Sequence, residues 1–108
     1  MKPCRIRVMR ISEYKDLMAQ YELPLKHACD MKEGMEFITD GEHCPKGFCE
    51  SAWMSLYPFV MTLSCGGTHI FGNWMKNQAS AMVSCNDGFR PVSFLIEVIQ
   101  EDEANEKV

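Results

Sequence analysis

The sequence lacks charge over one long stretch. No Asp, Glu, Lys or Arg occurs between Ser51 and Met75, although charged residues make up 24% of the chain. Because charged side chains are seldom buried without a partner, a stretch without them is expected to pack against the rest of the domain, a second subunit or a ligand. We therefore expect this stretch to supply the wall of any pocket.

The sequence also lacks the marks of a secreted or membrane-spanning protein. The charged N-terminal residues Lys2, Arg5 and Arg7 are followed by no apolar stretch, so no secretory signal is predicted. The apolar run from Ala52 to Cys65 contains Pro58 and is shorter than the roughly 20 residues that a membrane span needs. We expect a cytoplasmic protein with no membrane partner.

A clustered basic patch is missing as well. The net charge is −4, and Lys2, Arg5, Arg7 and Arg10 alternate along an extended segment. Alternation of this kind is more typical of a solvated strand face than of a nucleic-acid footprint. We therefore expect no nucleic-acid partner.

Cysteine, in contrast, is abundant, with six residues in a chain of 108. In a reducing cytoplasm these residues are expected to be thiols, metal ligands or redox groups rather than structural disulfides. The chain has no C-x-x-C pair, which argues against a thioredoxin-like mechanism. The single short pair, Cys44 and Cys49, does not match the duplicated spacing of zinc knuckles.

Hydrophobic periodicity predicts a small α+β domain. The expected strands and helices cover residues 4–11 (strand), 13–20 (helix), 34–39 (strand), about 49–66 (helix), 79–84 (strand) and 92–99 (strand). This order predicts a sheet of about four strands with two helices on one face. We assign residues 1–100 to this single domain and residues 101–108 to a charged flexible tail.

The second predicted helix is apolar on nearly all sides. Pro58 should kink or divide it, and Gly66 is expected to end it in a left-handed conformation. A helix of this kind must be covered on more than one side. In a chain too small to cover it twice, this pattern favours a homo-oligomer.

Two kinds of thiol chemistry are open. Cys29, Cys44 and Cys49 fall in or beside predicted loops, where soft thiolates could converge on zinc, iron or an iron–sulfur cluster, with His27 or His69 completing the site. Alternatively, Cys49 begins the long helix, where the helix dipole favours a thiolate, so it is a candidate catalytic nucleophile or redox group. The plainer alternative is that all of them are packing residues.

Non-thiol ligand contacts are predicted at four residues. Arg90 could bind a carboxylate or phosphate bidentately, although an Asp87–Arg90 pair that staples the turn is the favoured alternative. Trp53 and Trp74 could stack on a flat ligand. Trp53 is more typical of a core residue, whereas Trp74 follows Gly72 in an irregular segment and is the better ligand candidate.

Several short motifs occur together in this chain. They are Gly47-Phe48-Cys49, Ala52-Trp53, Tyr57-Pro58, Val60-Met61, Gly66-Gly67, Trp74, Cys85-Asn86-Asp87-Gly88 and Arg90-Pro91-Val92. In combination they resemble a small family of one-domain proteins, mainly from anaerobic bacteria and archaea, with the pattern GFCxxAWxxxYPxVM, GG and CxDGxRPV. The resemblance covers nearly the whole chain except the tail. Asn86 stands where proline is expected, which affects the turn geometry.

The resemblance implies no particular activity. It implies that six residues belong to the shared pattern: Cys29, Cys49, Cys85, Trp53, Asp87 and Arg90. The anaerobic habitat that it implies strengthens the interpretation as reduced thiols. We therefore expect a pocket of Cys, Trp and Arg side chains that binds a metal through Cys29, Cys49 and Cys85 or binds a small ligand. The alternatives are a thiol-dependent enzyme and a structural homo-oligomer.

Overall fold

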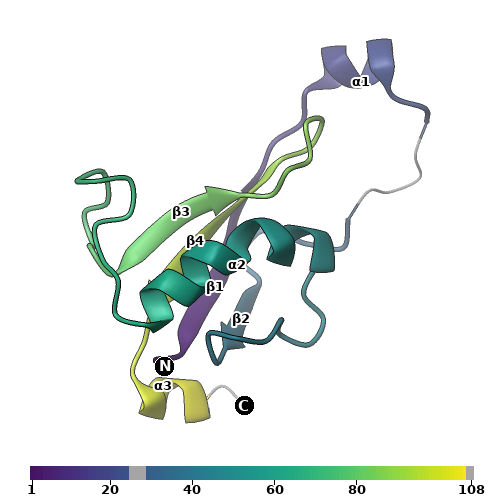
Figure 1. Cartoon of the computed structure of the whole chain (residues 1–108). Helices are drawn as coiled ribbons and strands as arrows, with labels where there is room; N and C mark the ends of the chain where they lie inside the picture. Colours follow the sequence, from purple (N-terminus) through teal and green to yellow (C-terminus); the bar gives the residue numbers. More distant parts are fainter. Residues whose placement is uncertain (25–28, 107–108) are drawn as a thin grey trace.

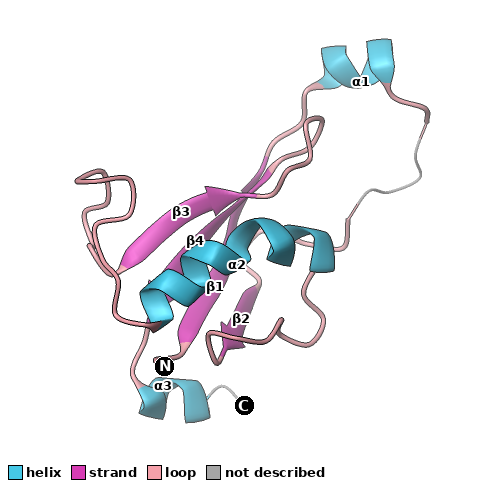
Figure 2. Cartoon of the chain, viewed as in Figure 1, coloured by secondary structure: helices cyan, strands magenta, loops and turns pink. Residues whose placement is uncertain are grey.

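The computed structural model describes residues 1–24 and 29–106, with the backbone alone for residues 104–106. Its elements run in the order β1 (Cys4–Ile11), α1 (Lys15–Tyr21), β2 (Glu36–Thr39), α2 (Glu50–Ser64), β3 (Ser80–Ser84), β4 (Val92–Val98) and α3 (Glu101–Glu106). The α+β class and the predicted order of its first six elements are confirmed (Figure 2). The short helix α3 occupies most of the segment that the sequence predicts to be a charged tail.

The four strands form one antiparallel sheet in the order β2-β1-β4-β3. At its centre, β1 pairs with β4, with Cys4 opposite Val98 and Ile6 opposite Ile96. Because side chains alternate along a strand, this register places the apolar residues of both strands on the same face. Ile6 and Ile96 are fully buried there.

Helix α2 covers that apolar face (Figure 1). Ala52, Leu56, Val60 and Leu63 recur at helical spacing and are all buried. They pack in one core cluster with the inward residues of β1 and β4. The helical part of the uncharged stretch therefore supplies the inner side of the domain, as predicted, whereas most residues from Cys65 to Met75 are exposed. None of the described helices has the length and apolar character needed to cross a membrane.

Of the two effects predicted for Pro58, a kink or a division of the helix, the division does not occur, because α2 continues through Pro58 as one element. Proline removes the amide that would bond the carbonyl of Met54. Met54 is 80% exposed, so water can take the place of that amide. The predicted end is confirmed: Gly66 has φ 93°, and the amides of Gly66 and Gly67 bond the carbonyls of Leu63 and Thr62, as in a Schellman motif.

The opposite face of the sheet is polar and partly solvated. Arg5 pairs with Glu97 at 3.2 Å and Arg7 pairs with Glu36 at 2.9 Å, each across neighbouring strands. The alternating basic residues of β1 therefore form a strand face with paired carboxylates. This arrangement agrees with the predicted solvated face.

Helix α1 differs from the prediction, which placed both helices on one face of the sheet. It buries none of its residues and lies beyond the end of the sheet (Figure 1). The segment that leads into α1 is attached to the β3–β4 turn by two backbone hydrogen bonds. The amide of Ser12 donates to the carbonyl of Pro91, and the amide of Tyr14 donates to the carbonyl of Phe89.

Replacement of Leu56 by alanine tests the packing of α2. Leu56 is fully buried, and leucine-to-alanine changes in a core lower the free energy of unfolding by about 2–5 kcal/mol. We expect a loss in this range in urea-induced unfolding. The matched control is Leu17→Ala on α1, where the side chain is 37% exposed, and the expected change is about 0.5 kcal/mol or less. Equal losses in the two variants would contradict the assigned packing.

Candidate functional site

A pocket of about 310 Å³ lies where the start of α2 meets the β3–β4 turn. Its wall includes Cys29, Cys49, Cys85, Asn86, Asp87 and Arg90. We call it the cysteine pocket. Five of these six residues are ones that the sequence singles out, and they come from three segments that are far apart in the chain.

Cys49 occupies the position predicted for it, at the start of α2. It is the N-cap residue of the helix, with extended backbone angles and no side-chain capping bond. The first amides of a helix have no partner within the helix, and Ser51 and Ala52 of this first turn also line the pocket. The half-buried thiol of Cys49 therefore lies beside the positive end of the helix dipole.

Cys85 and Asp87 are held by the turn that follows β3. The amide of Cys85 bonds the carbonyl of Val92 at 3.0 Å, and its sulfur accepts a bond from the amide of Val92 at 3.3 Å. The carboxylate of Asp87 accepts bonds from the amides of Phe89 at 2.8 Å and Arg90 at 3.0 Å. Asp87 therefore staples the turn through backbone amides, which fixes the orientation of the residues on either side.

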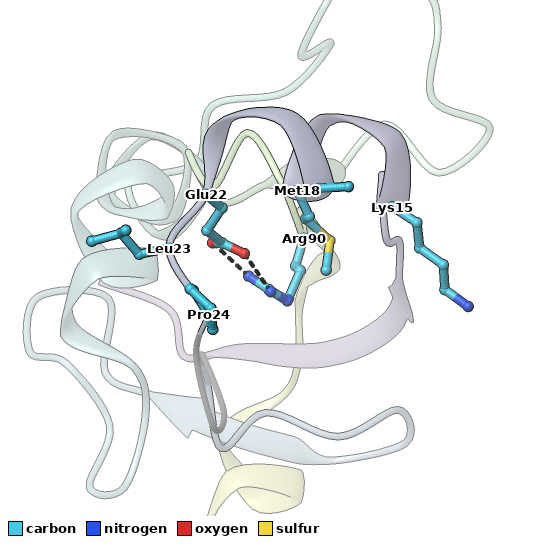
Figure 3. A pocket seen from close by; sticks show the side chains of 7 residues that line it. Lys15, Met18, Glu22, Leu23, Pro24 and Arg90 are labelled. Carbon is cyan, nitrogen blue, oxygen red and sulfur yellow. Dashed lines mark hydrogen bonds and ion pairs between the residues drawn. The ribbon is translucent and has the colours of Figure 1, made fainter.

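The guanidinium of Arg90 pairs with Glu22, at the C-terminal end of α1. Nη1 donates to Oε2 at 2.9 Å and Nη2 donates to Oε1 at 2.6 Å (Figure 3). Both side chains are partly buried, with 18% and 13% of their surface exposed. The bonds to Glu22 are the main reason why the pKa of Arg90 is raised, and the charges of Asp87 and Glu13 add to this effect.

The side-chain pairing of Arg90 differs from the pairing with Asp87 that the sequence favours. The guanidinium pairs with Glu22, which lies 68 positions away in the chain, whereas Asp87 accepts a bond from the backbone amide of Arg90. Nothing in the local sequence around Glu22 indicates this contact. Arg90 also lines a second pocket, of about 410 Å³, together with Glu22, Met18 and Pro24.

Cys29 reaches the cysteine pocket from the loop before β2. Although the residue as a whole is exposed, its sulfur is partly desolvated, and this raises the pKa of the Cys29 thiol. A bond from the amide of Met31 opposes the shift, while Cys49, Cys85 and Asp30 add to it electrostatically. All three cysteines line the same pocket.

The geometry gives no support to the predicted zinc or iron site at Cys29, Cys49 and Cys85. Within residues 1–24 and 29–106, no group of three or more His, Cys, Asp or Glu side chains is placed to hold a metal ion. His27, one of the two predicted additional ligands, lies outside the described residues. The other, His69, is exposed and bonds Thr68 at 2.8 Å.

The remaining three cysteines do not line the cysteine pocket. Cys4 is fully buried in the core, and its sulfur lies 3.3 Å from the hydroxyl of Ser64. Burial raises the pKa of Cys4 and of the half-buried Cys44. Cys65 caps the C-terminal end of α2 and is exposed.

Neither Trp53 nor Trp74 lines the cysteine pocket. Trp53 is half-buried and packs against the core, with its ring centroid 6.4 Å from Phe48 and 5.4 Å from Tyr57. This agrees with its interpretation as a core residue. Trp74 is 82% exposed, in the segment between α2 and β3.

Trp74 ends a row of three aromatic rings. Its centroid lies 5.8 Å from that of Phe71, which lies 5.7 Å from Phe59 of α2. Phe71 and His69 adopt the left-handed region with φ 59°, which is uncommon for such residues. This row is a feature separate from the cysteine pocket.

No family model, curated protein sequence or solved structure matches the chain. The candidate site therefore depends on the geometry of the chain's own residues, and the family resemblance stays a prediction.

The raised pKa of Cys29 predicts slow reaction of this thiol near neutral pH. Its thiolate, the reactive form, should be less populated in the folded protein than in the unfolded chain at the same pH. We expect the midpoint of the pH dependence of iodoacetamide labelling at Cys29 to be higher in the native protein than in urea, as read by peptide mass spectrometry.

The matched comparison removes one contributing thiol. Cys49→Ser should lower the native midpoint of Cys29, whereas Cys65→Ser, outside the pocket, should leave it unchanged. Equal midpoints in the native protein and in urea would show that the thiol is not desolvated.

Proposed function

We propose that this protein binds a small ligand in the cysteine pocket, in contact with the thiols of Cys29, Cys49 and Cys85. One observation carries the proposal: three cysteines from distant parts of the chain converge on one pocket beside Asp87 and Arg90. Cysteines that only fill a core are usually buried, whereas Cys29 is exposed and Cys49 and Cys85 are half-exposed.

The dimensions and lining of the pocket indicate the kind of ligand. Its volume of about 310 Å³ is at the lower end of the range of ligand pockets, so the ligand has few atoms. The lining combines soft sulfur atoms with the polar groups of Asn86, Asp87 and Arg90. A ligand with one polar end and one thiol-seeking or apolar end fits this lining best.

A second candidate function is that of a thiol-dependent enzyme. It is favoured by Cys49, which sits at the uncapped start of α2 and faces the pocket. In this function the sulfur of Cys49 would form a bond to an electrophilic carbon of the bound ligand, while the leaving group of that carbon departs with the bonding electrons and the thiol proton passes to solvent.

A metal function remains a further alternative at the same three cysteines. The described residues do not form a preassembled metal site, so zinc or iron binding would need the thiols to move closer together. The six free cysteines also support our proposal of a reducing compartment, the cytoplasm, as the site of action.

Native mass spectrometry of protein purified without oxygen tests the proposed function. We expect a bound small molecule, or failing that a metal ion, that is lost from Cys49→Ser and Cys85→Ser and kept in Cys65→Ser. A covalent adduct on Cys49 would favour the enzyme. The proposal is wrong if the wild-type protein carries nothing and if the small-molecule fraction of a cell extract leaves its unfolding temperature unchanged.

We also propose that the chain forms a homo-oligomer through the outer side of α2. After Glu50 this helix has no charged residue, although the solvent side of a surface helix is usually charged. Met54 and Pro58 are exposed on it, and Tyr57 and Met61 are half-exposed. Because a two-fold contact brings the same surface of both copies together, a surface without charge can associate with itself without like-charge repulsion.

Light scattering coupled to size exclusion tests the oligomer. We expect the wild-type protein to be larger than a monomer at micromolar concentration. Met54→Lys should make it monomeric, because the contact would bury an unpaired charge. Met82→Lys is the matched control, since Met82 is 43% exposed on β3, away from α2. A monomeric wild-type protein would refute the proposal.

A further inference from the structure

Arg90 lines both pockets, and it is the one positively charged residue among the described residues that line the cysteine pocket. In the structure this group is occupied by the carboxylate of Glu22 through two parallel hydrogen bonds. Figure 3 shows the two side chains pointing toward one another, while Lys15 points away from them. The arrangement is the one by which arginine recognises a free carboxylate.

We propose that the cysteine pocket binds a ligand with an oxyanion group. In the absence of ligand, the carboxylate of Glu22 occupies the position on Arg90 that this group would take. The inference rests on the proposed function and adds the chemical class of the ligand. A carboxylate, or a phosphate of similar geometry, would replace Glu22 on the guanidinium. The rest of the ligand would extend toward the three thiols.

The exchange is favoured by the way in which α1 is attached. The helix that ends at Glu22 buries none of its residues, so releasing Glu22 exposes little apolar surface. The hydrogen bonds of Ser12 and Tyr14 to the β3–β4 turn can stay in place, because both residues precede the helix. The guanidinium of Arg90 would exchange the carboxylate of Glu22 for the oxyanion of the ligand. Because this position is partly buried, the hydrogen bonds to the ligand would be stronger than in water.

The remainder of the turn supports a fixed position for Arg90. Asp87 holds the amides of Phe89 and Arg90, and Cys85 is bonded to Val92 on the other strand. The backbone of Arg90 is therefore anchored independently of Glu22. Removal of Glu22 should free the guanidinium without moving the place from which it extends.

The test compares two alkylating reagents that differ in one group. Iodoacetate carries a carboxylate and iodoacetamide a neutral amide; in both reactions the cysteine sulfur bonds the methylene carbon, iodide leaves and the thiol proton passes to solvent. The measured quantity is the ratio of the iodoacetate rate to the iodoacetamide rate at each cysteine, resolved by peptide mass spectrometry.

In Glu22→Gln the ratio at Cys49 and Cys85 should rise by about three-fold or more, because the freed guanidinium of Arg90 can bind the carboxylate of the reagent through two parallel hydrogen bonds. Adding Arg90→Lys to this variant should reverse most of the rise, since lysine keeps the charge but not the forked geometry. Cys65, outside the pocket, is the internal control for the change in net charge. Circular dichroism and urea unfolding of each variant check that the sheet is intact.

The source of the oxyanion is distinguished by competition at constant ionic strength. Slower reaction of Glu22→Gln with iodoacetate in the presence of acetate identifies a carboxylate, and slowing by inorganic phosphate identifies a phosphate. Protection by neither, or a rise in the ratio that is equal at Cys65 and at the pocket cysteines, would overturn the inference. It would do so even if a bound small molecule had confirmed the proposed function, so the two proposals can fail separately.

Discussion

The packing of α2 against the central strands β1 and β4 is the contact on which the rest of the structure depends. Among the described helices, α2 alone contacts several residues of the sheet, and its contacts extend from β1 and β4 to the edge strand β3. Leu56 and Val60 on one side and Ile6, Phe94 and Ile96 on the other are all fully buried. The same contact fixes where α2 begins, and with it the position of Cys49 beside the β3–β4 turn.

Much of the fold follows from patterns that are short in sequence. Alternation in β1 and β4, the helical spacing in α2 and the glycine pair after it depend on neighbouring residues, so they can be predicted from the sequence. The placement of α1 could not be predicted. The apolar spacing of Leu17, Met18 and Tyr21 is typical of a helix that covers a core, but the attachment of Ser12 and Tyr14 to the turn directs this helix away from the sheet.

For the candidate site, sequence reasoning named most of the residues but not their partners. Cys49 at a helix start and Asp87 in a turn carry local signals. The loop positions of Cys29 and Cys49 indicated that these two thiols could converge, whereas Cys85 joined them only through the resemblance. All three line the pocket. The pair of Glu22 with Arg90 carries no local signal, because it joins two surface segments whose approach is set by the whole fold.

The strand order has a consequence for how the chain assembles. The central pair of the sheet joins the first strand to the last, with Cys4 opposite Val98, whereas β3 and β4 are connected by a short turn. The β3–β4 hairpin can therefore form early, but closing the loop between β1 and β4 requires nearly the entire chain. During synthesis, β1 has no central partner until β4 has left the ribosome, so the core under α2 cannot be completed before that point.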